Sequence, residues 1–316
     1  MKKNTFLLPI AALTLTLAAC GTDDSTGSDA TNDNKEEITI KHELGETTVE
    51  KNPETVVVFD YGTLDTLDSL DVEVAGIPKT PNEKVPNYLS HYIDDEYVNV
   101  GGLKEPDFEA INAMDPDLII ISGRQSDMYD EFTDIAPTIY MGLDTTRYME
   151  SFEENVMTVA GIFDKEEEAA DQLEAVQASI DELHEEVAAE DKSALVTLAV
   201  DGKISAYGAG SRFGMIYDVL GFKPLDDTID ESTHGQNISY EYIVEENPEY
   251  LFVVDKDGLV GGESSSAKQY LENELVEQTT ASQDDHIVYL DASYWYYSDG
   301  GLTSVQGMVD EVAAGL

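Results

Sequence analysis

Three arginines stand out in a chain that is otherwise strongly acidic. The sequence has 66 acidic and 17 basic residues, and its only arginines are Arg124, Arg147 and Arg212. Arg124 follows the apolar run 118–121, and Arg212 follows a glycine-rich turn at 207–211. A guanidinium group offers a planar set of donors that fits anionic groups and can stack on aromatic rings. Arg124 and Arg212 therefore predict a site for an anionic ligand, whereas Arg147 borders a charged helical stretch and is expected to be structural.

A gapless internal repeat gives Arg124 a counterpart. Residues 108–124 align with residues 240–256, and both copies contain an aromatic residue, a glutamate, a proline and a final basic residue, Arg124 or Lys256. Each copy predicts a short helix, a turn and a buried parallel strand. Ligands of open α/β sheets bind beyond the carboxyl ends of the strands. We therefore expect two similar α/β lobes whose cleft brings the two cations together.

The remaining apolar segments complete the fold prediction. Apolar residues at helical spacing from 147 to 190 predict a connecting helix that acts as a stiff strut, with Gly161 and Asp164 marking the one place where it could break. The fold class is therefore α/β, with two Rossmann-like lobes at 38–146 and 191–316 joined by a long rigid helix. Buried strands are expected at 55–60, 137–142, 194–200 and 286–291.

The N-terminal segment has the pattern of an export signal followed by a tether. Residues 1–19 combine two lysines with a 14-residue apolar run, which is too short to span a bilayer. The run ends in Leu17-Ala18-Ala19-Cys20, a pattern typical of a bacterial lipobox, so Cys20 is expected to become an acylated N-terminus. Residues 20–37 are small, polar and acidic and predict a flexible tether. We expect an extracytoplasmic protein that is lipid-anchored to the outer face of the cell membrane.

The overall composition narrows the function further. A formal charge of −49 excludes nucleic acid as a partner, because that binding depends on Lys and Arg. A surface this acidic repels itself in dilute buffer, and this repulsion is screened at about 1 M salt, where the Debye length is about 3 Å. A salt-tolerant source is one hypothesis, and an acidic extracellular protein is the alternative. The single cysteine excludes an intrachain disulfide.

Enzyme motifs fit the sequence poorly. It has no Gly-x-Ser-x-Gly elbow, no His-Glu-x-x-His pair and no cysteine nucleophile, and the glycine spacing 208–214 misses the dinucleotide-binding pattern. We therefore expect no catalysis and no cofactor. A secreted hydrolase would need a nucleophile–base pair in the cleft, and an adhesin would not need converging cations. Both stay open as less favoured alternatives.

Several short strings, taken together, resemble one family. They are ISGRQ, GSRFG, THG, NPEYLFVVD, VGGESSSAK and YWYYS, and the resemblance covers about residues 38–316. It is to the substrate-binding lipoproteins of ABC importers for ferric siderophores, in the catecholate branch with petrobactin-type and enterobactin-type binders. The resemblance implies a class III periplasmic-binding-protein-like fold. It also implies that Arg124, Arg212 and a third basic residue line the cleft. That third position is usually Arg and is Lys256 here.

The same resemblance implies roles for five other residues. His234 and Tyr296 match positions that complete the iron shell when a siderophore supplies only four donors, and Trp295 lies in the aromatic run expected at the ligand. Glu109 and Glu241, equivalent in the repeat, match residues that dock on the two permease subunits. A favourable interaction with the helix dipole is the alternative role for these two glutamates.

The expected function is capture of an anionic ferric catecholate and its delivery to an ABC permease and ATPase. Ferric iron prefers hard oxygen donors, and a complex of three catecholates carries about three negative charges, which the basic residues would neutralise. We expect a monomer. Ferric hydroxamate, haem and cobalamin are alternative ligands, and the arginines favour an anionic complex over a neutral ferric hydroxamate.

Overall fold

The computed structural model describes residues 36–79, 85–229, 234–257 and 266–316. The predicted signal segment, Cys20 and nearly all of the predicted tether lie outside these ranges and stay predictions. Within the described ranges, no helix is both long enough and apolar enough to span a bilayer.

The first lobe contains a five-stranded parallel sheet in the order β5-β4-β3-β6-β7. Its central strands are entirely buried, as expected for runs of Val, Ile and Leu that are covered on both faces. A hairpin of β1 (Glu37–His42) and β2 (Gly45–Glu50) precedes the sheet. The sheet strands are β3 (Val56–Val58), β4 (Gly76–Ile77), β5 (Val98–Asn99), β6 (Leu118–Ile121) and β7 (Thr138–Tyr140).

The second lobe contains a six-stranded mixed sheet with the main order β11-β9-β8-β12-β13, while β10 pairs with β8. Strands β8, β12 and β13 are parallel, whereas β9 returns antiparallel to β8 and β11 is antiparallel to β9. The two lobes are therefore less alike than the repeat alone predicted. The strands are β8 (Ser193–Val200), β9 (Lys203–Tyr207), β10 (Lys223–Pro224), β11 (Gln236–Ile238), β12 (Tyr250–Asp255) and β13 (Ile287–Asp291).

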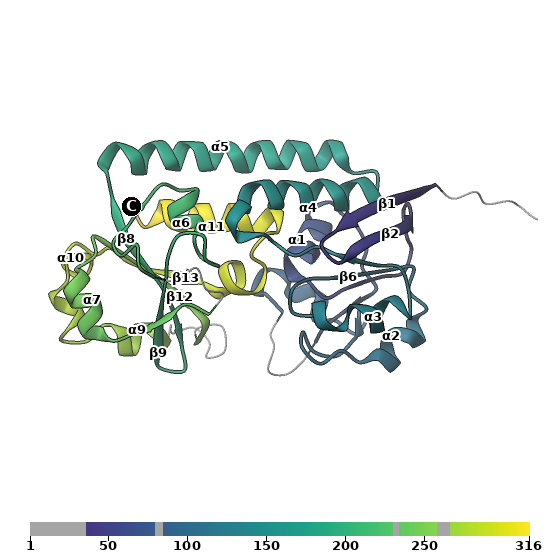
Figure 1. The fold of residues 1–316 in the computed structure, drawn as a ribbon, viewed down its shortest axis with the longest axis horizontal. Coiled ribbons are helices and arrows are strands. Elements are labelled where there is room, and N and C mark those ends of the chain that lie inside the picture. The colour runs from purple at the N-terminus through teal and green to yellow at the C-terminus, as the bar shows by residue number, and fades with distance from the viewer. Residues whose placement is uncertain (1–35, 80–84, 230–233, 258–265) are drawn as a thin grey trace, which may run out of the picture. The chain divides into compact units, whose positions relative to one another are not determined.

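The predicted connecting segment at 147–190 breaks once, at the predicted place, and forms two helices, α4 (Tyr148–Ile162) and α5 (Glu166–Glu190). They are separated at Asp164, which has a left-handed backbone with φ 54° and pairs with Lys51. Figure 1 shows that α5 alone runs along both lobes. Its buried residues recur at helical spacing and face the core, so α5 is the rigid strut.

Shorter helices connect the strands of both lobes. They are α1 (Tyr61–Ser69), α2 (Phe108–Met114), α3 (Tyr129–Thr133), α6 (Met215–Asp218), α7 (Tyr240–Glu246), α9 (Ser266–Leu271), α10 (Thr280–Gln283) and α11 (Leu302–Ala314). Single turns of tighter or wider helix are η1 (Asn87–Ile93), η2 (Ser126–Met128), η3 (Thr145–Arg147), η4 (Val276–Gln278) and η5 (Ser293–Tyr297).

A buried carboxylate ties α11 to the first lobe. Asp65 on α1 is fully buried and accepts backbone hydrogen bonds from Thr303 (3.2 Å) and Ser304 (2.7 Å). These N–H groups belong to the first turn of α11 and have no partner within the helix. A side chain at Gly301 would overlap the Asp65 carboxylate, so glycine is needed there. Because α11 also packs on α5, one hydrophobic cluster joins α4, α5 and α11 to the sheet of the second lobe.

We expect this carboxylate to make stability depend on pH. Burial raises the pKa of Asp65 from 3.8 to about 6, although hydrogen bonds from Thr303 and Ser304 lower it. The folded protein therefore binds this proton more tightly than the unfolded chain does. Its contribution to stability is present below about pH 4 and is lost as the pH rises through about 6. Between about pH 4 and pH 6, the free energy of unfolding should fall more steeply in the wild type than in Asp65→Asn, as measured by urea titration.

A matched variant checks that the pH dependence of the free energy of unfolding comes from the Asp65 carboxylate. Asp71 lies just beyond α1, is exposed, and has a left-handed backbone that asparagine also tolerates. Asp71→Asn removes the same charge and should keep the wild-type dependence on pH. Parallel curves for the wild type and Asp65→Asn would show that Asp65 titrates alike in the folded and unfolded states.

Candidate ligand-binding cleft

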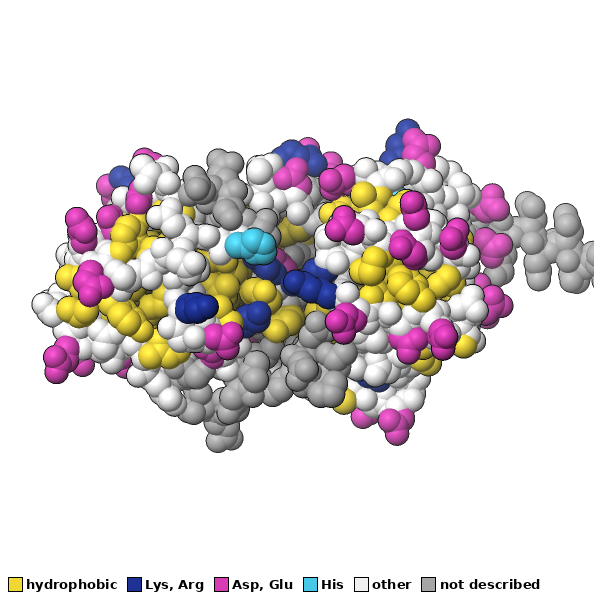
Figure 2. All heavy atoms as spheres, turned by 60° about the horizontal axis from the view of Figure 1, so that its bottom comes forward, with side chains coloured by type: hydrophobic (Ala, Val, Ile, Leu, Met, Phe, Trp, Pro, Cys, Tyr) yellow, Lys and Arg dark blue, Asp and Glu magenta, His cyan; other side chains and the backbone are white. Residues whose placement is uncertain are grey.

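A cavity of about 820 Å³ lies where the carboxyl ends of the first-lobe strands meet loops of the second lobe. In Figure 2, Lys and Arg side chains gather in the hollow between the lobes, although acidic side chains are spread over the rest of this face. The lining residues used below are Asp60, Ser122, Arg124, Tyr140, Arg212 and Asp299.

The two predicted arginines converge on one backbone carbonyl. Arg124 follows the end of β6, and its Nη2 donates to the carbonyl oxygen of Tyr296 at 3.1 Å. Arg212, from the glycine-rich loop after β9, donates through Nη2 to the same oxygen. The Nε of Arg212 lies 3.4 Å from a carboxylate oxygen of Asp299 but makes no hydrogen bond among the described residues. The structure therefore brings together cations that are far apart in the sequence, one from each lobe.

Lys256 joins the same group, with Tyr296 at its centre. It follows the end of β12, and its Nζ donates to the Tyr296 hydroxyl at 3.2 Å while lying 4.3 Å from the ring centroid. The guanidinium carbon of Arg212 lies 4.1 Å from that centroid. Burial raises the pKa of Tyr296, but the positive charges of Arg212, Lys256 and Arg124 together outweigh it, so the pKa is lowered. The three cations therefore favour the oxyanion form of an aromatic hydroxyl at this point.

None of the aromatic run lines the cavity, and neither does Lys256, so Arg124 and Arg212 alone of the predicted cations do. Trp295 is fully buried in the core, where its Nε1 donates to Glu311 at 2.9 Å, and it is not among the residues that line the cavity. Burial raises the pKa of Glu311 to about 7. The structure thus separates Trp295 from the cleft surface, where the sequence analysis expected it. The reason is local, because η5 is a π-helical turn that directs neighbouring side chains to different sides.

His234, the other predicted iron ligand, lies outside the lining of the cavity. It is exposed and lies just before β11. Within the described ranges, no group of three or more His, Cys, Asp and Glu side chains could hold a metal ion.

The sequence analysis missed the acidic members of the cleft. Burial raises the pKa of Asp299, while Arg212 and Arg124 lower it. Asp60 follows β3 and caps α1, so it also lies at the carboxyl end of a parallel strand. The strand-end argument that identified Arg124 would have identified Asp60 too. Asp299 gave no such signal, because it lies in an irregular turn before α11.

The two predicted docking glutamates are equivalent in structure as well as in sequence. Glu109 and Glu241 are exposed and lie in the first turns of α2 and α7, which begin at Asp107 and Ser239. Both helices end at a residue with a left-handed backbone. The pKa of Glu241 is lowered because its carboxylate accepts hydrogen bonds from the Glu241 backbone N–H and from the Ser239 side chain. The repeat therefore presents one anionic side chain on each lobe.

These features define a two-lobed, cleft-forming solute-binding protein. The chain belongs to the periplasmic binding protein family, whose sequence model matches residues 56–294. It is 49% identical over 320 residues to the petrobactin-binding protein YclQ of Bacillus subtilis, covering 100% of this chain and 99% of that protein. It is 31% identical over 283 residues to the ferric-anguibactin-binding protein FatB of Vibrio anguillarum, covering 88% and 87%.

Solved structures give the same result. The crystal structure of YclQ matches with a TM-score of 0.84 at 51% identity, over 89% of this chain and 99% of that one. The periplasmic catecholate-siderophore binding protein VctP from Vibrio cholerae matches with a TM-score of 0.83 at 37% identity, over 88% and 100%. The predicted fold class, two α/β lobes joined by a long rigid helix as in class III periplasmic binding proteins, is confirmed.

Proposed function

We propose that this protein captures an anionic ferric catecholate siderophore in the cleft and delivers it to an ABC permease for iron uptake. The observation that carries the proposal is the convergence of Arg124, Arg212 and Lys256 on Tyr296. Catecholates combine aromatic rings with oxyanions. Guanidinium groups both donate to such oxyanions and stack on such rings. The similarity to proteins named for petrobactin and catecholate siderophores supports the same class of ligand.

Tyr296 suits a second role at the iron itself. Its lowered pKa favours the phenolate, a hard oxygen donor of the type that ferric iron prefers. If the siderophore supplies only four donors, Tyr296 would provide a fifth, and a movement of the segment around His234 would provide the sixth. With a siderophore that supplies six donors, both residues would contact only the organic part. Because the ligand brings the metal, the protein needs neither a resident cofactor nor catalysis.

The proposal places the protein outside the cell membrane, as a monomer held by a lipid on Cys20. The lipobox and the small, polar tether support the anchor. Glu109 and Glu241 would dock on two permease subunits, since they are exposed and equivalent on the two lobes.

Titration of the purified protein with a panel of ferric siderophores tests the ligand class. Tryptophan emission would report binding, because Trp295 precedes Tyr296 and a ferric catecholate absorbs visible light. We expect tight binding of ferric catecholates and weak or no binding of ferric hydroxamate, haem and cobalamin. Preference for any of those three would replace the proposed ligand while leaving the binding-protein fold intact.

Lys256→Arg tests how closely the cleft is fitted to its ligand. Arginine would keep the charge and add planar donors beside Tyr296, so we expect up to about tenfold tighter binding of ferric catecholates or a broader ligand range. Isothermal titration of both proteins measures the change. Weaker binding by the variant would mean that the single ammonium group of Lys256 is fitted to one particular ligand shape.

A further inference from the structure

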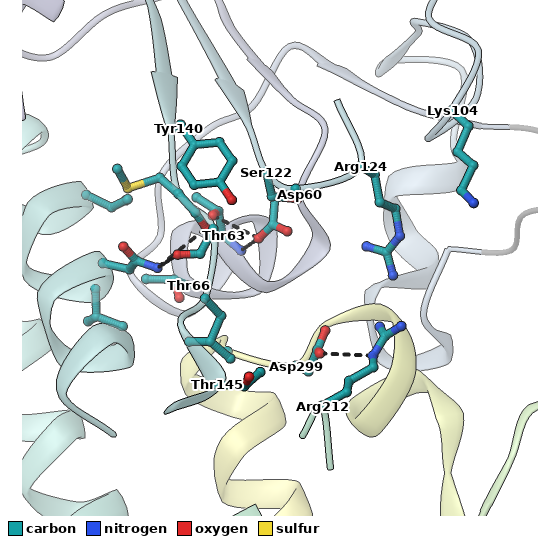
Figure 3. Close-up of a pocket in the computed structure, with 18 of the residues that line it drawn as sticks. Asp60, Thr63, Thr66, Lys104, Ser122, Arg124, Tyr140, Thr145, Arg212 and Asp299 are labelled. Carbon is teal, nitrogen blue, oxygen red and sulfur yellow. Dashed lines mark hydrogen bonds and ion pairs between the residues drawn. The ribbon is translucent and has the colours of Figure 1, made fainter. Parts of the chain in front are cut away.

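The cleft has two chemically different ends. Arg124 and Arg212 line one end, and behind them Lys256 contacts the same Tyr296. In Figure 3, Asp60, Ser122 and Tyr140 lie together on the other side of the cavity, away from Arg124 and Lys104. We name Asp60, Ser122 and Tyr140 the inner compartment. The proposed ferric catecholate accounts for the cationic end only.

Asp60 has one carboxylate oxygen left for a ligand. Its Oδ1 caps α1 by accepting hydrogen bonds from the backbone N–H (2.7 Å) and the hydroxyl (3.0 Å) of Thr63. Its Oδ2 has no hydrogen-bond or ion-pair partner in the part of the chain that the structure describes. The side chain is half-buried and lines the cavity, so a full negative charge faces this space.

Ser122 provides a second, independent polar group. It is only 6% exposed and lines the cavity. Among the described residues its hydroxyl makes no hydrogen bond, so it is available to a ligand in the cavity.

Tyr140 completes the inner compartment at the end of β7. A side chain at Gly142 would overlap the Tyr140 hydroxyl, so the glycine allows the ring to fold back over the strand end. Burial and the nearby carboxylates of Glu43 and Asp60 raise the pKa of Tyr140. The hydroxyl therefore stays neutral and can accept a hydrogen bond.

We propose that the inner compartment binds a protonated amine on an arm of the siderophore. One free carboxylate oxygen and two hydroxyl oxygens form a set of acceptors that matches the N–H donors of an ammonium group, and the half-buried charge of Asp60 is stabilised by an opposite charge. An anionic arm would be repelled by Asp60. The inference rests on the proposed function and specifies its ligand as a ferric catecholate that carries a cationic amine.

Two synthetic ferric bis-catecholates that differ at one linker nitrogen test this assignment. One has a free secondary amine, and in the other that amine is acetylated. We expect the wild type to bind the amine roughly tenfold more tightly. Asp60→Asn keeps an oxygen that can cap α1 but removes the charge, so it should bind both ligands about equally. Fluorescence or calorimetric titration gives the affinity ratio for each protein.

Asp107→Asn is the matched control. Asp107 caps α2 in the same lobe by accepting from the Ala110 N–H at 3.0 Å, and it lies outside the cavity, so this variant should keep the wild-type preference. Asp60→Ser, which retains a capping oxygen, replaces Asp60→Asn if that variant is unstable.

The possible outcomes separate the two proposals. Equal affinities of the wild type for both ligands would overturn the inner compartment and leave the proposed function standing. If Asp60→Asn still bound the free amine more tightly than the acetylated ligand, Asp60 would not be the residue that recognises the amine. Failure of the wild type to bind either ligand would overturn the proposed function and the inference together.

Discussion

Arg124→Ala and Arg212→Ala should each weaken ferric catecholate binding by about 10- to 150-fold, and the double variant should bind more weakly still. Each substitution removes a charge-assisted contact of roughly 1.5–3 kcal/mol from the same point in the cleft. Arg212→Ala would also leave Asp299 without the cation that lies 3.4 Å away. Calorimetric titration measures the affinities, and thermal unfolding shows whether each variant is folded.

Two further variants serve as controls. One removes an arginine outside the cleft, and the other keeps the positive charge of Arg212 but removes its planar group. Arg147→Ala removes the third arginine, which is exposed and pairs with Asp144 and Glu150, so it should bind like the wild type. Arg212→Lys keeps the charge but loses the planar group over the Tyr296 ring, and it should recover only part of the affinity. Unchanged affinity in both alanine variants would contradict the assignment of the cationic end as the binding site.

The Glu109→Ala, Glu241→Ala double variant should bind siderophore normally and fail to support uptake. Both side chains are exposed on separate helices outside the cavity, so the cleft would not change. Losing one anionic contact from each lobe should reduce transport by at least about tenfold, while each single variant should lose less. Uptake of radiolabelled iron and siderophore-stimulated ATP hydrolysis by the reconstituted importer both measure the effect.

A control with the same loss of charge isolates these positions. Glu131 on α3 and Glu245 on α7 are also exposed, one on each lobe, and the Glu131→Ala, Glu245→Ala variant should transport normally. Normal uptake by the Glu109, Glu241 variant would leave these residues with only the favourable interaction with the helix dipole.

The cationic end of the cleft could be predicted from the sequence because each of its residues is positioned by the strand that directly precedes it. Arg124 and Lys256 each follow a recognisable buried strand, and the carboxyl ends of parallel strands share one edge of a sheet. The same logic applies to Asp60, which follows β3. Any residue whose place depends only on its own strand could therefore be found before the structure was known.

Positions that depend on distant partners could not be found in this way. The Asp65 carboxylate caps a helix that begins more than 230 residues later, and no short pattern contains that pairing. Trp295 was misplaced because its burial depends on α11, where Glu311 accepts a hydrogen bond from the indole N–H.

The placement of Arg124 and Arg212 in the cleft has a kinetic consequence. The chain carries a formal charge of −49, so an anionic ferric complex is repelled until it comes within a few ångströms of Arg124, Arg212 and Lys256. Added salt screens the distant repulsion more than the contacts inside the cleft. The association rate should therefore rise with ionic strength, the reverse of the usual behaviour for binding between opposite charges, and capture would be fastest in saline surroundings.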